Sequence, residues 1–261
     1  ATHNLQRSAE TAGASFEFNA EVVEIRRQGG RVEGISLKDG RAIDTGVVVN
    51  ASGPHSAVVN RMAGAALEMK VGTRPLRKEV HFLPFPKGGR GQPYGRLASD
   101  ADVGVYSREE AGGLILVGSI DPECDSLEWV EDPDDFNREV TENQWKAQVY
   151  RMGLRIPELE IPNRTKGVVD LYDATDDWIP IYDRSSLDGF YLAVGTSGNQ
   201  FKTAPMVGQL MAELIEACES GQDHDADPVH VRGPYTGRDL NIGFYSRNRE
   251  IHRDSSFSVL G

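Results

Sequence analysis

Residues 189–215 read GFYLAVGTSGNQFKTAPMVGQLMAELI, and this stretch decides the fold class that the sequence predicts. Its first part, Gly189–Val194, is typical of a buried strand; the glycine-rich loop Gly195–Gln200 follows; and Thr203–Ala217 repeats apolar side chains at helical spacing. A strand, a loop and a helix in this order place unpaired backbone N–H groups and the positive end of a helix dipole at the carboxyl edge of a sheet. Such an edge favours a phosphate, a carboxylate or the polarised carbonyl of a ring.

Lys202 lies between this loop and the helix and adds a positive charge there. Because glycine-rich turns between strands and helices are common, a plain strand–helix unit with a solvated lysine explains the local spacing about equally well. The spacing alone therefore predicts the local structure and leaves the ligand open.

A second loop of the same kind follows the β-branched run Val47–Val49. In this loop, Ala51–Ser56 (ASGPHS), the glycine at position 53 allows a ligand to approach the backbone closely. Taken singly, a tight turn into a short helix over Ser56–Ala63, ending at Gly64, is the simpler interpretation.

A third cluster, DLYDATDDWIP at 170–180, holds four acidic residues within eight positions. Carboxylates at this density can bind a cation, but a solvated turn beside a strand explains them more simply. No metal site is therefore expected here.

The rest of the chain gives a coarse pattern of elements. We expect the end of a helix over Ala1–Gly13, and a polar tail without a clear period after Gly221. The expected strands are Ser15–Asn19, Glu21–Arg27, Arg31–Leu37, Lys78–Phe85, Val103–Ser107 and Leu114–Ile120, with hairpin turns at 28–30 and 38–40, a turn at 86–89 and a helix near Asp134–Leu154.

Length, charge and cysteine content limit the class of protein. The chain has 261 residues, which corresponds to one or two domains. Its 28 basic and 40 acidic residues give a net charge of −12, which repels phosphate backbones and anionic lipids, so neither nucleic acid nor a membrane is expected as a partner. No apolar run approaches the roughly 20 residues that span a bilayer. Two cysteines, Cys124 and Cys218, are too few for a disulfide framework or a metal cluster. We expect a cytoplasmic protein.

Three stretches together resemble the D-amino-acid oxidase-like FAD oxidoreductases, especially glycine oxidase, sarcosine oxidase and dimethylglycine dehydrogenase. The first covers residues 13–56, where GASFEFNAEVVEI, GRVEGI and VVVNASGPHS carry the similarity. The others are YDATDDWIPIYDR at 172–184 and the stretch at 189–215. The Gly195–Leu214 motif is fairly specific and the NASGPHS loop moderately so, whereas residues 65–165 and the tail are only loosely similar.

The resemblance implies an FAD enzyme that oxidises the C–N bond of an amino acid or N-methylated amine by hydride transfer to the flavin. It implies that the backbone of Val22 borders the adenine and that Ala51 and Gly53 lie near the cofactor's phosphates. Lys202 would also help to anchor a substrate carboxylate, and Tyr172 would lie over the substrate. The residues that match the loop at the pyrimidine edge of the flavin are Gly195, Thr196, Gly198, Phe201 and Lys202.

Some positions depart from the family pattern. Relatives often have His-Gly where this chain has Asn199-Gln200, which leaves side-chain contacts there open. Asp170 stands where sarcosine oxidases carry a flavin-linking cysteine, so the resemblance implies non-covalent FAD. The strand Leu114–Gly118 lacks the lysine that some oxidases place near the flavin to activate oxygen, which favours a dehydrogenase.

The family's opening Gly-x-Gly-x-x-Gly turn does not occur in these 261 residues. We therefore expect the C-terminal portion of such an enzyme, with α/β and α+β structure: a partial, Rossmann-like FAD-binding layer that lacks its first βαβ unit, and an antiparallel-sheet substrate domain. The FAD-binding part is expected over 1–72 and 166–222, the substrate domain over 73–165, and a C-terminal tail over 223–261.

An alternative is a non-catalytic binding module, or a subunit that completes its fold with a partner chain. The missing turn supports it, and the loop around Lys202 speaks against it. On either view, the uncovered sheet edge predicts self-association, and the chain by itself is expected to bind FAD poorly and to be inactive. His81 is a weaker candidate as a proton acceptor, because a histidine in a strand is more simply explained by packing. The tail residues that could bind a metal are better explained as part of a solvated acidic tail; they are His224, Asp225, Asp227 and His230.

Overall fold

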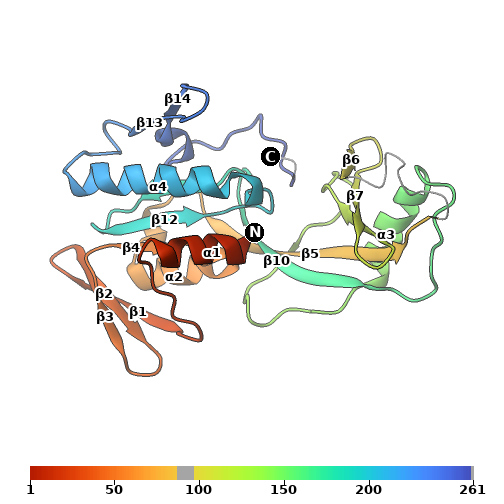
Figure 1. Ribbon diagram of the computed structural model, residues 1–261, viewed down its shortest axis with the longest axis horizontal. Coiled ribbons are helices and arrows are strands. Elements are labelled where there is room, and N and C mark those ends of the chain that lie inside the picture. Colours follow the sequence, from red (N-terminus) through yellow and green to blue (C-terminus); the bar gives the residue numbers. More distant parts are fainter. Residues whose placement is uncertain (87–96, 260–261) are drawn as a thin grey trace.

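The computed structural model of the protein describes residues 1–86 and 97–259. Its α-helices are α1 (Thr2–Thr11), α2 (Ser56–Ala63), α3 (Glu142–Gly153) and α4 (Ala204–Glu219). Figure 1 shows two bodies joined by a pair of long strands: α1, α2 and α4 belong to one body, and α3 belongs to the other. The fold is mixed α/β with antiparallel sheets.

A three-stranded sheet forms the centre of the first body, in the order β11 (Ile181–Arg184), β12 (Phe190–Val194), β4 (Val48–Asn50). Because side chains alternate along a strand, β12 serves two cores. Phe190, Leu192 and Val194 pack on the side of α2, and Tyr191 packs on the side of α4. The predicted strand and helix at 189–217 are therefore confirmed, with both faces of the strand buried.

Small elements cover the two sides of this sheet. The two predicted hairpins form the meander β1 (Val22–Gln28), β2 (Arg31–Leu37), β3 (Ala42–Asp44). On the side of α4 lie β13 (His230–Arg232), β14 (Asp239–Asn241) and the 3-10 turn η5 (Ile242–Tyr245). The tail thus contains regular structure that its sequence pattern did not reveal.

The second sheet is antiparallel and joins the two bodies. Its order is β10 (Gly167–Thr175), β5 (Thr73–Pro84), β8 (Leu114–Ser119), β7 (Val105–Glu110), β6 (Ala98–Asp100), and β9 (Glu128–Trp129) also pairs with β5. Helix α3 covers one face, where Trp145 and Val149 pack on Leu83 and Val117. Figure 1 shows β5 and β10 running from one body into the other.

One predicted element is wrong, and one predicted helix begins later than expected. Residues 15–19 form no strand; Asn19 adopts a φ of +55°, which interrupts an extended chain, and the rings of Phe16 and Phe18 stack on the surface with their centroids 6.3 Å apart. Helix α3 begins only at Glu142, after its cap Thr141.

The residues before Thr141 stay irregular because their carbonyl groups bind Arg77. Its Nε donates to the carbonyl of Asn137 and its Nη2 to that of Glu139, each at 2.6 Å. A continuous helix over this stretch would have used those acceptors for its own hydrogen bonds.

The interpretation of the acidic cluster and the tail as solvated is wrong for Asp177 and His224, which are buried, whereas Asp225 is exposed but ion-paired. Asp177 is buried and accepts two hydrogen bonds from Arg249, at 2.7 and 3.0 Å. Asp225 pairs with both terminal nitrogens of Arg247, each at 2.9 Å, and His224 is 2% exposed. These acids are structural partners of tail arginines.

The predicted turn at 86–89 extends into residues 87–96, which lie outside the described residues. Among the residues that the structure describes, no helix is both long enough and apolar enough to cross a membrane.

Candidate functional site

The two glycine loops lie at the same edge of the three-stranded sheet. Strands β4 and β12 are parallel, with Val48 paired to Phe190 and Asn50 paired to Leu192. Since parallel strands end on the same side, the loop after Asn50 and the loop that begins at Gly195 share the carboxyl edge. In open α/β sheets this edge is where ligands bind.

Asp173, on β10, holds the Gly195 loop in place. Its carboxylate accepts the N–H of Gly195 at 2.6 Å, the N–H of Thr196 at 3.1 Å and the hydroxyl of Thr196 at 2.6 Å. The backbone N–H of Ser197 donates to the carbonyl oxygen of Asp173 at 3.0 Å. These three N–H groups are therefore bound to Asp173 and are not available to a ligand.

The end of this loop presents a ring and a cation. Phe201 is 76% exposed and Lys202 is also exposed, just before α4 begins at Ala204. Within the described residues, no ion pair to Lys202 occurs, and the cap residue Thr203 makes no side-chain hydrogen bond to the first turn of α4. The positive end of the α4 dipole and the ammonium group of Lys202 thus lie next to each other in the chain. Within the described residues, the helix end has no side-chain cap and the ammonium group has no ion-pair partner.

The second loop is held from within. Asn50 is buried; its Nδ2 donates to the carbonyl of Ser56 at 3.0 Å and its Oδ1 accepts the N–H of Ser52 at 3.1 Å. This leaves Ala51 exposed and puts Gly53 at a φ of +56°, with open space where a Cβ would project. A ligand can therefore approach the backbone at Gly53, and a side chain there would be strained.

Val22 lies apart from these loops in the chain, as the first residue of β1. Its side chain is half-buried against the core that contains Ile25 and Val32. The structure gives Val22 a packing contact, and its place beside the adenine stays a prediction.

Tyr172 brings the second sheet to the Gly195 loop. Its ring packs so closely on Gly198 that a Cβ there would lie 2.3 Å from Cε2 of the ring. Only glycine fits at this contact. Two of the predicted site residues, Tyr172 and Gly198, are thus in direct contact although they lie 26 positions apart in the sequence.

A second tyrosine, Tyr106, belongs to this site and was missed in the sequence analysis. Its hydroxyl lies near that of Tyr172, and burial raises the pKa of both groups. Tyr106 lies on β7, two strands from β5 in the sheet order, and only the register brings it to Tyr172. The sequence indicates that Tyr106 lies in a strand, but it does not indicate that Tyr172 is its neighbour.

His81 faces the opposite side of this sheet. It is fully buried, with its ring edge-on to Trp145 of α3 at a centroid distance of 5.3 Å. The packing interpretation of His81 is therefore confirmed, and burial lowers its pKa.

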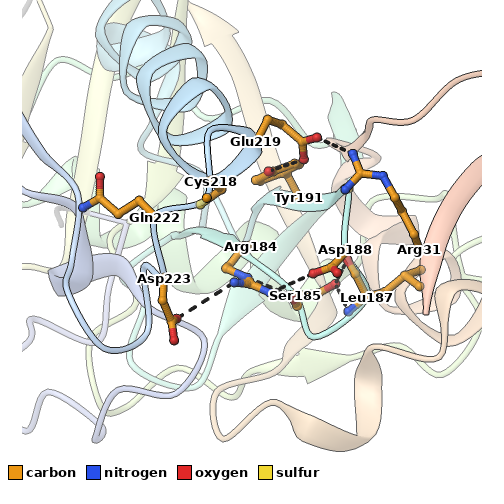
Figure 2. A pocket seen from close by; sticks show the side chains of 12 residues that line it. Arg31, Arg184, Ser185, Leu187, Asp188, Tyr191, Cys218, Glu219, Gln222 and Asp223 are labelled. Atoms are coloured by element: carbon orange, nitrogen blue, oxygen red, sulfur yellow. Dashed lines mark hydrogen bonds and ion pairs between the residues drawn. The ribbon is translucent and has the colours of Figure 1, made fainter. Parts of the chain in front are cut away.

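A separate pocket of about 320 Å³ lies at the other end of β12 (Figure 2). Figure 2 shows Arg31 pointing to Glu219 at the end of α4, and Tyr191 donates to the same carboxylate at 2.8 Å. Arg184 pairs with Asp188 at 3.1 Å. The charged groups of this pocket thus bind one another, and they join the end of α4 to β2 and β12.

Charged groups that pair with one another in this way are typical of a structural contact between elements. The pocket lies beside Gly189, where β12 starts, so it is at the edge opposite to the two glycine loops. We therefore place the candidate site at the carboxyl edge. Among the described residues, no group of three or more His, Cys, Asp or Glu side chains is placed to hold a metal ion.

Comparison with known proteins shows that the chain is similar to FAD-dependent oxidoreductases. The profile of a family described as "FAD dependent oxidoreductase" (DAO) matches residues 1–214. The chain is 25% identical over 222 residues to the sarcosine oxidase subunit beta of Rhodobacter capsulatus, a match that covers 80% of this chain and 46% of that protein. It is 28% identical over 189 residues to the FAD-dependent oxidoreductase domain-containing protein 1 of Bos taurus, covering 66% and 36% of the two chains.

Solved structures show the same fold. The L-proline dehydrogenase from P. horikoshii superposes with a TM-score of 0.70 at 21% identity, covering 94% of this chain and 57% of that one. The glycine oxidase from Bacillus cereus superposes with a TM-score of 0.65 at 22% identity, covering 87% and 56%. The chain thus spans from about a third to somewhat over half of the length of these relatives. It resembles part of their fold, and by the match over residues 1–214 the chain belongs to the DAO family of FAD-dependent oxidoreductases.

Proposed function

We propose that this chain forms the flavin-facing and substrate-facing part of an FAD-dependent oxidoreductase that oxidises the C–N bond of an amino acid or N-methylated amine by hydride transfer. The sheet β11–β12–β4 is then a partial Rossmann-like layer that lacks its first βαβ unit, formed by residues 1–72 and 166–222. Residues 73–165 are the substrate domain, and 223–261 are the C-terminal tail.

One observation carries the proposal. The carboxyl-edge loop from Gly195 to Lys202 meets the tyrosine pair of the second sheet through the contact between Gly198 and Tyr172. A flat cofactor at the edge would thus have a cation and a helix end on one side and two hydroxyl groups on the other. A plain strand–helix turn would not need a glycine held against the ring of a half-buried tyrosine.

The residues present fit one half of FAD. The open backbone at Gly53 allows a phosphate to approach, and the start of α4 with Lys202 suits the negative charge that a reduced flavin carries. The exposed ring of Phe201 offers an apolar surface beside them. Gly195 and Thr196 contribute by the shape of the loop, since their N–H groups bind Asp173.

In this mechanism the protein positions charge and substrate. When bound, the flavin supplies the hydride acceptor. Lys202 binds a substrate carboxylate, an interaction of about 1 kcal/mol in water and several in a site that excludes water. Tyr172 and Tyr106 stay protonated, because burial raises the pKa of each hydroxyl, and so they act as hydrogen-bond donors. The products are a carbonyl compound and a smaller amine, after hydrolysis of the imine.

The alternative is a non-catalytic module, or a subunit that completes its fold with a partner. The absence of a Gly-x-Gly-x-x-Gly turn from the 261 residues favours it. The two proposals differ in what the chain does in the presence of FAD and of the rest of a family enzyme.

Flavin binding tests the proposal. The purified chain is mixed with FAD, and the flavin absorbance and fluorescence are followed during titration, with a Gly53→Val variant as the matched control. We expect weak binding by the chain that Gly53→Val abolishes, and no turnover. Identical flavin spectra with and without the protein, at concentrations well above micromolar, would leave the non-catalytic module as the better explanation.

A further inference from the structure

The chain passes from the second sheet to the first at a tight corner. Strand β10 ends at Thr175, the corner covers residues 176–180, and β11 begins at Ile181. Within the corner, Trp178 is 3% exposed and has a φ of +62°, a left-handed conformation that strains a residue other than glycine. A strained turn keeps its shape only where the contacts around it hold it. The contacts of this corner therefore decide how the two sheets meet.

Arg249, from the C-terminal tail, binds the polar groups of the corner. Its Nε and Nη2 donate to the buried carboxylate of Asp177 at 3.0 and 2.7 Å. Nη2 also donates to the carbonyl oxygen of Ile179 at 2.6 Å, and Nη1 donates to that of Pro180 at 3.2 Å. A guanidinium group presents its N–H donors in a fixed, planar fork. A single side chain thus holds the acceptors of the whole corner relative to one another.

Other tail residues extend this contact. The N–H of His252 donates to Oδ2 of Asp177 at 3.3 Å, and the hydroxyl of Ser255 donates to the carbonyl oxygen of Asp177 at 2.5 Å. Val259 then packs on a buried apolar cluster against which Tyr172 also packs. The members of this cluster are Leu76, Ala174 and Trp178. The tail therefore reaches both the corner and the residues that support the tyrosine.

Thr175 connects the corner to the Gly195 loop. Its hydroxyl donates to the carbonyl oxygen of Ile179 at 2.8 Å, and the same oxygen accepts a hydrogen bond from Arg249. The N–H of Thr175 donates to Oγ of Ser197 at 3.3 Å. Its methyl group lies against Gly195, where a Cβ would be 2.2 Å from Cγ2 of the threonine. Since Thr175 is 1% exposed and packed on all these groups, a shift of its side chain must move the loop.

Ser197 is the loop residue that receives this support. It is fully buried and has a φ of +48°. Its hydroxyl donates to the carbonyl oxygen of Gly195 at 3.2 Å, and its N–H donates to that of Asp173 at 3.0 Å. Such a conformation persists in a residue other than glycine only where its surroundings fix it. A continuous series of hydrogen bonds thus runs from the tail, through the corner, to the loop that leads to Lys202.

We propose that Arg249 is a positioning residue of the candidate site: it fixes the corner and thereby Thr175, and Thr175 fixes the loop from Gly195 to Lys202 beside Tyr172. The ligand of this loop rests on the proposed function, whereas the series of contacts is a property of the chain alone. Arg249 acts through other residues and is not required to touch the reacting atoms. The C-terminal tail is thereby part of the site.

Hydrogen exchange tests the inference without flavin or turnover. Exchange is followed by NMR at the amide of Ser197, and the amide of Val117, inside the second sheet, reports on global unfolding. Arg249→Lys keeps the positive charge and loses the fork. The exchange rate at Ser197 relative to that at Val117 should therefore rise about tenfold, because the loop opens locally.

The matched control is Arg253→Lys, at an exposed position of the same tail, which should leave this ratio unchanged. An unchanged ratio in Arg249→Lys overturns the inference, because a merely structural arginine changes global stability and not the loop in particular. If Arg249→Lys does not fold, Ser255→Ala takes its place. This variant removes another hydrogen bond to the corner, and the ratio should rise about threefold.

A second substitution tests whether the effect passes through Thr175. Thr175→Val keeps the size of the side chain, loses the hydroxyl and should by itself raise the ratio, whereas the exposed Thr165→Val should not. In the Thr175→Val background, Arg249→Lys should add less than about twofold, since the connection is already broken. Effects that multiply in the double variant overturn this route. If Thr175→Val does not fold, Ser197→Ala breaks the next hydrogen bond of the series and replaces it.

A binding experiment connects the inference to the proposed function. In the complete protein, Arg249→Lys should weaken the affinity for N-methylglycine about threefold, and this loss should disappear in a Lys202→Met background. The reason is that the loop then carries no ammonium group to misplace. An equal loss in both backgrounds overturns the positioning of Lys202. A complete protein that does not bind or oxidise amino acids would instead contradict the proposed function, and would leave the exchange results unaffected.

Discussion

Asp173 accepts a hydrogen bond of 2.6 Å from the backbone N–H of Gly195, and so joins the second sheet to the edge of the first. Asp173 is 3% exposed, and burial raises the pKa of its carboxyl group. The loop that carries Lys202 is therefore built on an acid of β10, the strand that runs between the two bodies of the molecule. Substitutions at Asp173 should act on the loop before they act on either sheet.

Replacing Asp173 with Asn should loosen this loop. The amide turns one acceptor into a donor that faces N–H groups, which should cost about 1–3 kcal/mol of unfolding free energy. Urea unfolding measures the loss, and hydrogen exchange at Gly195 and Thr196 should speed up. Asp170→Asn, at an exposed position on the same strand, is the control and should change neither.

Lys202→Met should leave the fold intact and damage the site. The ammonium group is exposed and makes no ion pair within the described residues, so the unfolding free energy should change by less than about 0.5 kcal/mol. In the complete protein, affinity for an amino acid should fall at least tenfold, about 1.4 kcal/mol. The exposed Lys166→Met is the control. Unchanged amine turnover in Lys202→Met would make this residue a surface lysine.

The pair formed by Arg249 and Asp177 should hold the tail. The side chains are 5% and 0% exposed, and Arg249→Met leaves a buried carboxylate without its partner. This should cost about 3–5 kcal/mol and make residues after 221 sensitive to proteases. Lys70→Met breaks an exposed pair with Glu250, of 60% and 89% exposure, and should cost less than about 1 kcal/mol. Equal effects of the two substitutions would contradict this ranking.

Stability should fall on mild acidification. Burial lowers the pKa of His81 and His224, so below the ordinary histidine value of about 6.5 the unfolded chain takes up protons that the folded chain refuses. The unfolding free energy is thus full above this pH and should fall by about 1.4 kcal/mol per unit for each histidine as the pH decreases. Urea midpoints between about pH 8 and pH 5 measure it.

Asn is the informative substitution at His224. Nδ1 of His224 accepts the N–H of Val229 at 3.0 Å, and an amide oxygen can take over this role. His224→Asn should flatten the dependence on pH, whereas the exposed His3→Asn should not. An unchanged slope in His224→Asn would show that other groups set the acid limb.

The chain should self-associate. Helix α1 has no buried residue, Phe18 is 68% exposed, and Val49 of the edge strand β4 is 40% exposed. Apolar groups and an open strand edge on one body favour association. Light scattering should show species larger than a monomer, and Phe18→Ser should reduce them. A monodisperse monomer at high concentration would contradict this prediction.

Local patterns predicted the elements around the site well, because each depends on residues close in sequence. The strand at 189–194, the helix after Lys202 and the turn closed by Gly64 are examples; Gly64 has the expected left-handed φ of +74°. The resemblance added the family, which the profile match over residues 1–214 confirms.

The contacts that form the site could not be predicted, because they depend on pairing across the chain. Arg249 and Asp177 are 72 positions apart, and no spacing rule connects them. Tyr106 reaches Tyr172 only through the register of four strands. The acids at 173 and 177 looked solvated because their partners, the Gly195 loop and Arg249, lie outside any local window.

Strands β5 and β10 set a limit on how this molecule can be divided. The boundaries at 72 and 165 assign them to different units, yet every residue of β10 pairs with β5, from Gly167 with His81 to Thr175 with Thr73. A fragment cut at those boundaries would leave each strand without its partner. Calorimetry should therefore record one melting transition for both bodies, and an excised middle segment should not refold.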